Sequence, residues 1–258
     1  MAGIYFTPHL EADPERRDRD GLVRLRGALH PMDDLQWLDE YFRQVERARR
    51  LYGDRLLIGV GLEVGYEYGC EEWFAAVLAA YPFDYVIGSV HCLEHIAISS
   101  AAESARYFQG RAAQQVAADY FGKLAALVDC GLFDCVGHLD LYRRHGWRYL
   151  GEAVYNLHAG WLEPILLRMA AKGMGLEINS SSIRLGHAEC LPGLDLTRLA
   201  RDCGVRVFTV GSDAHCLSDL AVGLNRAQAQ LAKLKLGVAT FQRREAITLD
   251  KPQRCRLQ

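Results

Sequence analysis

The chain has 258 residues, half of them hydrophobic, and a formal net charge of −2. This length and apolar content are sufficient for a substantial buried core. The near-neutral charge excludes a general nucleic-acid binder, whose affinity would depend on a basic surface, and favours a small polar or anionic substrate as the partner.

Short apolar runs alternate with segments of helical period along the chain, which is the pattern of βα units around a parallel sheet. The predicted strands are residues 4–6, 56–62, 85–90, 135–139, 175–178 and 206–210. Continuous apolar runs are typical of strands that are buried on both faces.

The segments between these strands carry the start and stop signals of helices. Helices are predicted at residues 33–52, 111–130, 152–172, 196–203 and 218–235, and a short edge strand at 238–249. Asp33 or Asp34 is expected to cap the first helix and Ser218 the last. Pro164 should kink or split the helix in which it lies, because proline removes a backbone hydrogen bond.

No repeat or linker interrupts this series, so a single domain over residues 1–258 is expected. Polar residues follow every predicted strand, which favours a (β/α) barrel over an open doubly wound sheet, where they would gather at one crevice. No glycine-rich phosphate loop follows any strand, so the sequence predicts no nucleotide cofactor.

The N-terminal stretch lacks the basic start and apolar run of a secretion signal, and no segment has the roughly 18 nearly uncharged apolar residues of a membrane span. Eight cysteines without a Cys-x-x-Cys pair are typical of reduced thiols. We therefore expect a cytoplasmic protein with no membrane partner. The oligomeric state is left open, and a homo-oligomer is compatible with the sequence.

Histidines and acids are concentrated at the predicted strand ends. These residues are His9, Glu63, His91, His138, Asp140, Asn179, Asp213 and His215. Four of the nine histidines fall in these windows, where chance would place about one, given strands of about five residues. In a parallel barrel all these strand ends lie on one face. Imidazoles mixed with carboxylates favour Zn, Mn or Fe over Ca or Mg, and predict metal-assisted hydrolysis, with attack on phosphorus.

Each position also has a simpler explanation. A single buried histidine is more often a satisfied core residue than a metal ligand. Asp213 could cap a turn, and Glu63 could pair with an arginine. As a set, however, unpaired polar groups at a barrel mouth would be costly without a metal. His95 lies four residues after His91, but on a predicted loop and without the glutamate of a zinc protease motif, so no protease is predicted.

Two arginine sites are candidates for binding a substrate phosphate. Arg184 follows the fifth strand, and Arg143 and Arg144 follow the fourth. A guanidinium can hold a phosphate through two parallel hydrogen bonds. A surface salt bridge explains any one of these arginines equally well.

The sequence resembles the PHP (polymerase and histidinol phosphatase) family, and more closely its histidinol-phosphatase branch. The matching stretches are Phe-Thr-Pro-His at 6–9, Gly-Leu-Glu at 61–63, Asp-Tyr-Val-Ile-Gly-Ser-Val-His at 84–91, Gly-His-Leu-Asp-Leu-Tyr-Arg-Arg-His-Gly at 137–146, Leu-Glu-Ile-Asn-Ser-Ser-Ser-Ile-Arg at 176–184, Gly-Ser-Asp-Ala-His at 211–215 and Val-Ala-Thr-Phe at 238–241. They follow one another in order over nearly the whole chain.

This resemblance implies a distorted (β/α)7 TIM-like barrel with two or three divalent ions (Zn, Mn or Fe) that hydrolyses L-histidinol phosphate, a small phosphorylated substrate, in histidine biosynthesis. The implied metal ligands are Glu63, His91 and His138 for one ion, Glu63 and Asp213 for a second, and His9 and His215 for a third. Glu63 and Asp213 would thereby hold the bridging hydroxide that attacks phosphorus. Arg184 and one of Arg143 and Arg144 are the implied phosphate ligands.

The sequence departs from the family pattern at its start. The first family motif, His-x-His at the end of an opening strand, should precede residue 4, and no residues supply it. Pro8 also replaces the usual acid before His9. The first barrel strand is therefore expected to be missing from this chain, either because the true N-terminus is absent or because the protein is a degenerate member with an incomplete site.

Histidinol-phosphate hydrolysis is the leading functional hypothesis. Two alternatives are a PHP phosphoesterase acting on another small phosphoester or a nucleotide, and a catalytically impaired module that binds a phosphorylated ligand without turnover.

Overall fold

A computed structural model describes residues 3–249 of the chain. Its centre is a parallel sheet of seven strands, in which all six predicted strands are present. The strands follow the order β1 (Gly3–Phe6), β5 (Leu57–Gly65), β6 (Tyr85–Ser89), β9 (Cys135–Val136), β10 (Gly175–Asn179) and β11 (Phe208–Gly211). The seventh, β2 (His9–Glu11), continues the line of β1 along β5, with His9 opposite Glu63 and Glu11 opposite Gly65.

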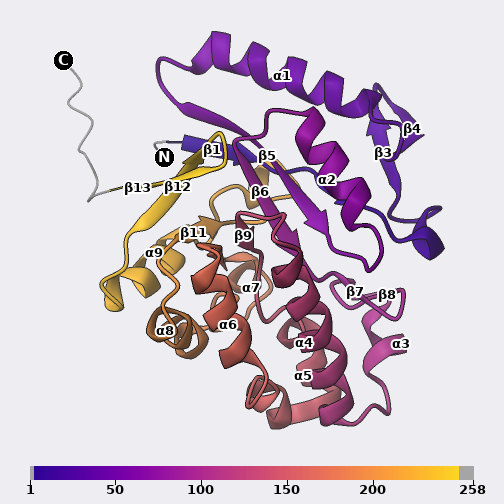
Figure 1. Ribbon diagram of the computed structural model, residues 1–258, viewed down its shortest axis with the longest axis vertical. Helices are drawn as coiled ribbons and strands as arrows, with labels where there is room; N and C mark the ends of the chain where they lie inside the picture. Colours follow the sequence, from indigo (N-terminus) through magenta and orange to yellow (C-terminus); the bar gives the residue numbers. More distant parts are fainter. Residues whose placement is uncertain (1–2, 250–258) are drawn as a thin grey trace.

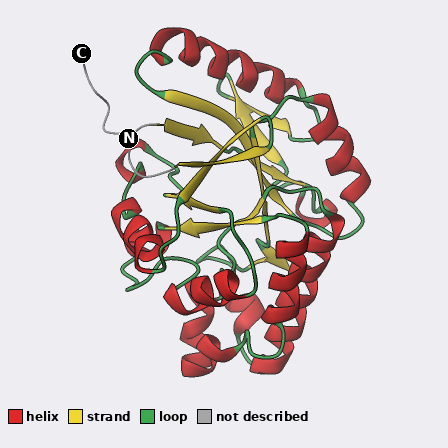
Figure 2. Cartoon of the chain, turned by 60° about the vertical axis from the view of Figure 1, so that its left-hand side comes forward, coloured by secondary structure: helices red, strands yellow, loops and turns green. Residues whose placement is uncertain are grey.

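The sheet is curled, and helices lie around its outside (Figures 1 and 2). The main helices are α1 (Gln36–Tyr52), α2 (Glu71–Ala80), α4 (Ala113–Cys130), α6 (Leu162–Ala171), α8 (Leu194–Asp202) and α9 (Leu224–Lys233). Strand and helix alternate along the chain, so the strands point the same way and their carboxyl ends meet on one face. The predicted α/β fold with a TIM-like sheet is confirmed.

Strands β1 and β11 form the two edges of this sheet among the described residues. The antiparallel hairpin of β12 (Val238–Gln242) and β13 (Glu245–Leu249) lies beside these edges. The Tyr5 hydroxyl lies 2.6 Å from Thr240 Oγ1, and the Phe241 ring stacks on Tyr85 with ring centroids 4.7 Å apart. The hairpin thus covers the amino-terminal side of the sheet, where the sequence predicted a single edge strand.

The predicted helices differ from the observed ones mainly at their starts. Helix α1 begins at Gln36 without a side-chain cap on Leu35, although Asp34 Oδ1 accepts a hydrogen bond from the Gln36 amide. The helix predicted over 152–172 is split into a 3-10 turn, Gly151–Asn156, and α6, in whose first turn Pro164 lies. Ser218 does not cap α9, which begins after Gly223, because a left-handed glycine turns the chain there.

Several short elements lie in the connections and were not predicted. They are β3 (Leu22–Leu25), β4 (Ala28–Pro31), β7 (Cys92–Leu93), β8 (Ile96–Ala97), α3 (Ser104–Phe108), α5 (Arg143–Leu150), α7 (Ser181–Arg184) and the 3-10 turns Pro14–Arg16 and Leu217–Asp219. Helix α2 was also missed; it lies in an apolar segment without a strong helical period.

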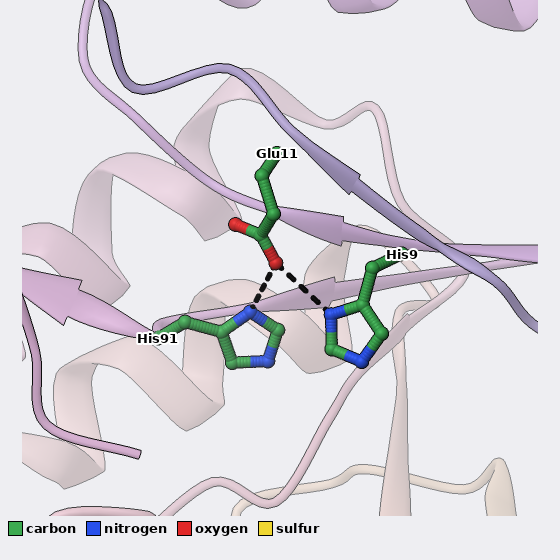
Figure 3. A group of neighbouring side chains, drawn as sticks. All are labelled: His9, Glu11 and His91. Carbon is green, nitrogen blue, oxygen red and sulfur yellow. Dashed lines mark hydrogen bonds and ion pairs between the residues drawn. The ribbon is translucent and has the colours of Figure 1, made fainter. Parts of the chain in front are cut away.

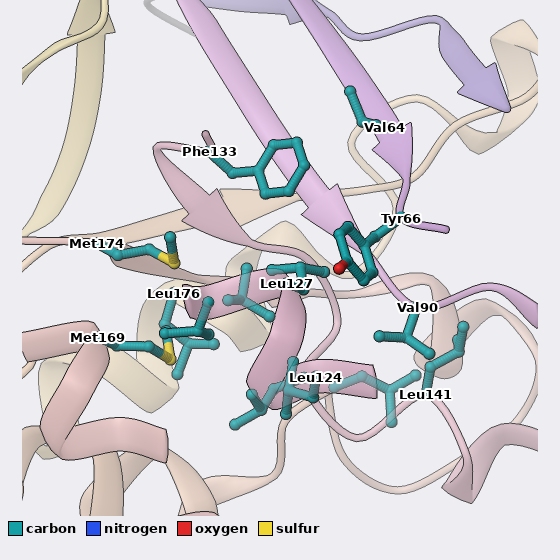
Figure 4. Packing of buried hydrophobic residues seen from close by; sticks show 14 of the residues in the cluster. Val64, Tyr66, Val90, Leu124, Leu127, Phe133, Leu141, Met169, Met174 and Leu176 are labelled. Carbon is teal, nitrogen blue, oxygen red and sulfur yellow. The ribbon is translucent and has the colours of Figure 1, made fainter. Parts of the chain in front are cut away.

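The core forms where the sheet packs against the helices. Val64 of β5, Leu176 of β10, Leu124 and Leu127 of α4 and Met169 of α6 belong to one cluster of buried hydrophobic side chains (Figure 4). All five are buried, which fixes the helices on the outer face of the sheet. No helix within residues 3–249 is long and apolar enough to cross a membrane.

Candidate metal centre

A cavity of about 500 Å³ opens at the carboxyl ends of the parallel strands. Five of the six predicted metal ligands line it: His9, His91, His138, Asp213 and His215. The sixth, Glu63, belongs to β5 and is buried behind them. The structure therefore brings together residues that are up to about 200 positions apart in the sequence, as parallel strands that end on one face require.

The carboxylate of Glu63 is the centre of this group. Its Oε1 lies 3.1 Å from both His91 Nε2 and His138 Nε2, and its Oε2 lies 3.6 Å from His9 Nε2. Donors that share one tetrahedral zinc ion at bonds of about 2.0–2.1 Å are about 3.3 Å apart. The observed spacing therefore fits donors placed around divalent ions, and Glu63, His91 and His138 form a fully buried three-donor set.

The electrostatics of the same group depend on burial and on the paired charges. Burial opposes the charge of Glu63, but the adjacent imidazoles of His9, His138 and His91 outweigh it and hold the pKa of Glu63 well below its usual value. Burial lowers the pKa of His138, whereas for His91 burial is outweighed by Glu11 and Glu63, which raise its pKa well above the usual value. Glu63 and His138 therefore have the protonation states that bind a metal, and His91 would release a proton on metal binding.

Asp213 and His215 lie on the loop after β11. The Asp213 side chain is 12% exposed, and its backbone has a φ of 51°, in the left-handed region that aspartate tolerates better than most residues. The His215 ring is 65% exposed and its centroid lies 5.8 Å from that of His9. His215 therefore stands at the outer rim, whereas Glu63 and His138 lie at the floor.

Two of the three predicted phosphate ligands line the cavity, namely Arg144 and Arg184. Arg144 Nη2 donates to Ser181 Oγ at 2.7 Å and to Asp213 Oδ2 at 3.2 Å. Arg184 donates to the backbone carbonyls of Ser212 and Asp213. Both guanidinium groups therefore lie beside the predicted metal ligands.

Arg143, the third predicted phosphate ligand, does not line this cavity. Its Nη1 lies 3.2 Å from Asp140 Oδ2, and both side chains are almost completely buried. Its Nη2 donates to the Tyr155 carbonyl. Arg143 is directed into the protein because α5 begins at this residue, and successive side chains of a helix point about 100° apart.

Two acids near the cavity were not among the predicted site residues. Glu11 accepts hydrogen bonds from His9 Nδ1 at 3.0 Å and His91 Nδ1 at 2.8 Å. Burial opposes its charge, but these two imidazoles lower the pKa of Glu11 to about 2. Glu177 of β10 is buried near Glu63, and burial together with the neighbouring carboxylates raises its pKa to about 8. Side chains two residues apart on a strand point the same way. A predicted strand that continued past Phe6 to residue 11 would therefore have placed Glu11 beside His9.

A second group of possible ligands lies nearby but is already neutralised. His95 Nδ1 is 2.9 Å from Asp13 Oδ1, and the buried Lys123 ammonium donates to Glu67 Oε2 at 2.6 Å. Since Lys123 already supplies a cation to Glu67, this group is an ion-pair network rather than a metal site.

Comparison with known proteins identifies the family. The model of the PHP domain matches residues 1–181, which is more than half of the chain. The chain belongs to the PHP domain family. A protein of Deinococcus radiodurans named "Probable histidinol-phosphatase" is 30% identical over 245 residues, covering 95% of this chain and 86% of that protein. The histidinol-phosphatase of Lactococcus lactis is 25% identical, covering 89% of each chain.

The fold of this PHP domain is also found in a solved structure. The crystal structure of histidinol phosphate phosphatase from Lactococcus lactis, in complex with Zn, L-histidinol and phosphate, superposes with a TM-score of 0.76. The alignment covers 96% of this chain and 88% of that one at 21% sequence identity. The arrangement of the sheet and helices is therefore shared between the two proteins.

Proposed function

We propose that the protein is a metal-dependent phosphomonoesterase that hydrolyses L-histidinol phosphate to L-histidinol and phosphate, a step of histidine biosynthesis. The observation that carries this proposal is the position of the Glu63 carboxylate, which faces nitrogens of three imidazoles that line a cavity together with Arg144 and Arg184. The relatives named as histidinol-phosphatases support the choice of substrate.

The side chains have separate roles in this proposal. Glu63, His91 and His138 would hold one divalent ion, and His9, Asp213 and His215 would complete the sites of one or two more. Such ions, when bound, supply Lewis acidity and an activated water. Zn is favoured by the imidazole-rich donor set and by the zinc in the Lactococcus lactis structure, and Mn and Fe share these ligand preferences.

Arg144 and Arg184 would bind the phosphate of the substrate. Each guanidinium can form charge-assisted hydrogen bonds with phosphate oxygens and hold the phosphorus atom in one orientation. Both are already fixed by hydrogen bonds to the loop that carries Asp213, so they need little reordering when the substrate binds. The seryl hydroxyl of Ser181 keeps Arg144 directed at the cavity.

Phosphate release from two substrates tests this proposal. Protein stripped with a chelator and reloaded with Zn or Mn should release phosphate from L-histidinol phosphate with a higher kcat/KM than from a mononucleotide. A higher kcat/KM for the mononucleotide would contradict the assignment of L-histidinol phosphate as the substrate. Binding of both compounds without turnover, in protein whose metal content has been verified, would identify a binding module instead of an enzyme.

A further inference from the structure

Glu11 links two of the histidines that face Glu63. It lies two residues after His9 in β2, so both side chains point to the same side of the strand. A single carboxylate oxygen, Oε1, lies 3.0 Å from His9 Nδ1 and 2.8 Å from His91 Nδ1 (Figure 3). The side chains of Glu11 and His91 are only 13% and 8% exposed, so the contact between them is largely shielded from water.

The other nitrogen of each ring faces Glu63. His91 Nε2 lies 3.1 Å from Glu63 Oε1, and His9 Nε2 lies 3.6 Å from Glu63 Oε2. In Figure 3 both Nε2 atoms lie on the side of the rings away from Glu11. An imidazole that binds a metal through Nε2 carries its remaining proton on Nδ1, and a carboxylate at Nδ1 fixes that tautomer and the ring orientation.

The backbone of β5 leaves room for this carboxylate. Gly65 pairs with Glu11 across the two strands, and a Cβ atom added to Gly65 would lie 1.8 Å from Glu11 Oε2. Any side chain at residue 65 would therefore push Glu11 away from the imidazoles. The position of Glu11 is thus set by two elements of the fold and not by its own rotamer alone.

We propose that Glu11 is a positioning residue that accepts the Nδ1 protons of both His9 and His91 and so directs their Nε2 lone pairs toward the metals. This inference rests on the proposed function, because the metals are those of the same site. Since His9 and His91 serve different ions in that site, one carboxylate sets the orientation of ligands for two ions.

Direct coordination by Glu11 is the competing role. Glu11, His9 and His91 are close enough to form a three-donor set through the Nδ1 atoms. That arrangement would leave a proton on His91 Nε2, where it would be donated to Glu63, and would remove His91 from the donor set with Glu63 and His138. Only two donors would then remain in the fully buried set, so the grouping of Glu63, His91 and His138 favours the positioning role.

Metal binding distinguishes these two roles. In competition with a chromophoric chelator, Glu11→Ala should weaken the binding of Zn about 10- to 100-fold and leave the number of Zn ions at saturation unchanged. Glu11→Gln keeps an oxygen acceptor and should recover part of the affinity. Gly65→Ala should weaken binding although Glu11 is present. Glu46→Gln, an exposed acid on α1, is the matched control and should bind Zn as the wild type does.

Nitrogen-15 NMR of the Zn-loaded protein provides the second measurement. The wild type should show slowly exchanging Nδ1–H signals for His9 and His91, and Glu11→Ala should lose both. Loss of one Zn equivalent at saturation in Glu11→Ala would instead establish direct coordination and overturn the proposal. Unchanged Zn affinity and NMR signals in a folded Glu11→Ala protein would also overturn it. Neither measurement uses a substrate, so a failed phosphatase assay leaves both results interpretable.

Discussion

At the residue scale, the candidate site depends on one acid that is surrounded by imidazoles. Glu63 lies in the buried strand β5, and its two oxygens face His9, His91 and His138. Burying a charged carboxylate without a partner would be costly. Here the imidazoles offset this cost, and in the proposed enzyme the metals would offset it as well. We therefore expect metal binding to depend on the position of this single side chain.

Replacing Glu63 should remove the metals. We expect Glu63→Gln, which keeps the shape but not the charge, to weaken Zn binding by more than the roughly 10- to 100-fold that an outer carboxylate contributes. Metal analysis after gel filtration, with Glu46→Gln as the control, measures this loss. Full metal content in Glu63→Gln would show that the ions bind elsewhere.

Replacing the two adjacent arginines should affect different properties: phosphate binding for Arg144 and stability for Arg143. Arg144→Ala should weaken the inhibition by inorganic phosphate about 10- to 100-fold, since a hydrogen bond to a charged group contributes about 1.5–3 kcal/mol. It should cost less stability than Arg143→Ala, because its partner Asp213 is 12% exposed whereas Asp140, the partner of Arg143, is 1% exposed. Arg148→Ala, on the exposed side of the same helix, should change neither property and is the matched control.

Arg143→Ala should have the opposite effect. Its removal leaves Asp140, which is 1% exposed, without its cationic partner, and breaking such a buried pair costs about 3–5 kcal/mol. Urea unfolding of the metal-free protein measures this loss. A weakened phosphate affinity in a stable Arg143→Ala protein would contradict the assignment of Arg143 to the core.

These arginines show a limit of what can be predicted from the sequence. The order of strands and polar residues predicts that His9, Glu63, His91, His138 and Asp213 converge, because parallel strands end on one face. It does not predict which of two adjacent arginines faces the cavity, because that choice depends on the residue at which α5 begins. Glu11 was missed for a related reason: the strand was ended at Phe6, although β2 continues the line along β5.

At the element scale, the β12–β13 hairpin extends the core beneath the site. Phe241 is almost completely buried and stacks on Tyr85, while Tyr5 connects β1 to the hairpin through Thr240. The sequence predicted only a single edge strand here. A hairpin that pairs with itself and contacts the sheet through side chains such as Tyr5 and Tyr85 leaves no distinct pattern in the sequence.

Truncation of Phe241 tests the contribution of the hairpin. Phe241→Ala should destabilise the protein by about 3–5 kcal/mol, as is typical for a buried phenylalanine, and leave the number of bound metals unchanged. Ile247→Ala, at a half-exposed position on β13, should cost much less. Equal denaturation midpoints for the two variants in urea would show that the hairpin contributes little to the core.

At the scale of the whole molecule, metal binding and folding should be coupled. The proposed ligands come from strands along the sheet and gather only in the folded chain, so bound ions should stabilise the folded state. At a free metal concentration of about 100 times Kd the gain is about 2.7 kcal/mol. For a chain of this size we expect a chelator to lower Tm by roughly 5–10 °C. Glu63→Gln should show no such difference, and an unchanged Tm in the wild type would contradict the coupling.

The most direct test of a metal-dependent histidinol phosphatase is a titration of Zn or Mn into chelator-treated protein. Bound metal and the rate of phosphate release from L-histidinol phosphate are measured in the same samples. The proposed function predicts that rate and metal content rise together in the wild type and that Glu63→Gln shows neither increase. Absence of phosphate release from fully metal-loaded wild-type protein, or metal-independent release, would contradict it.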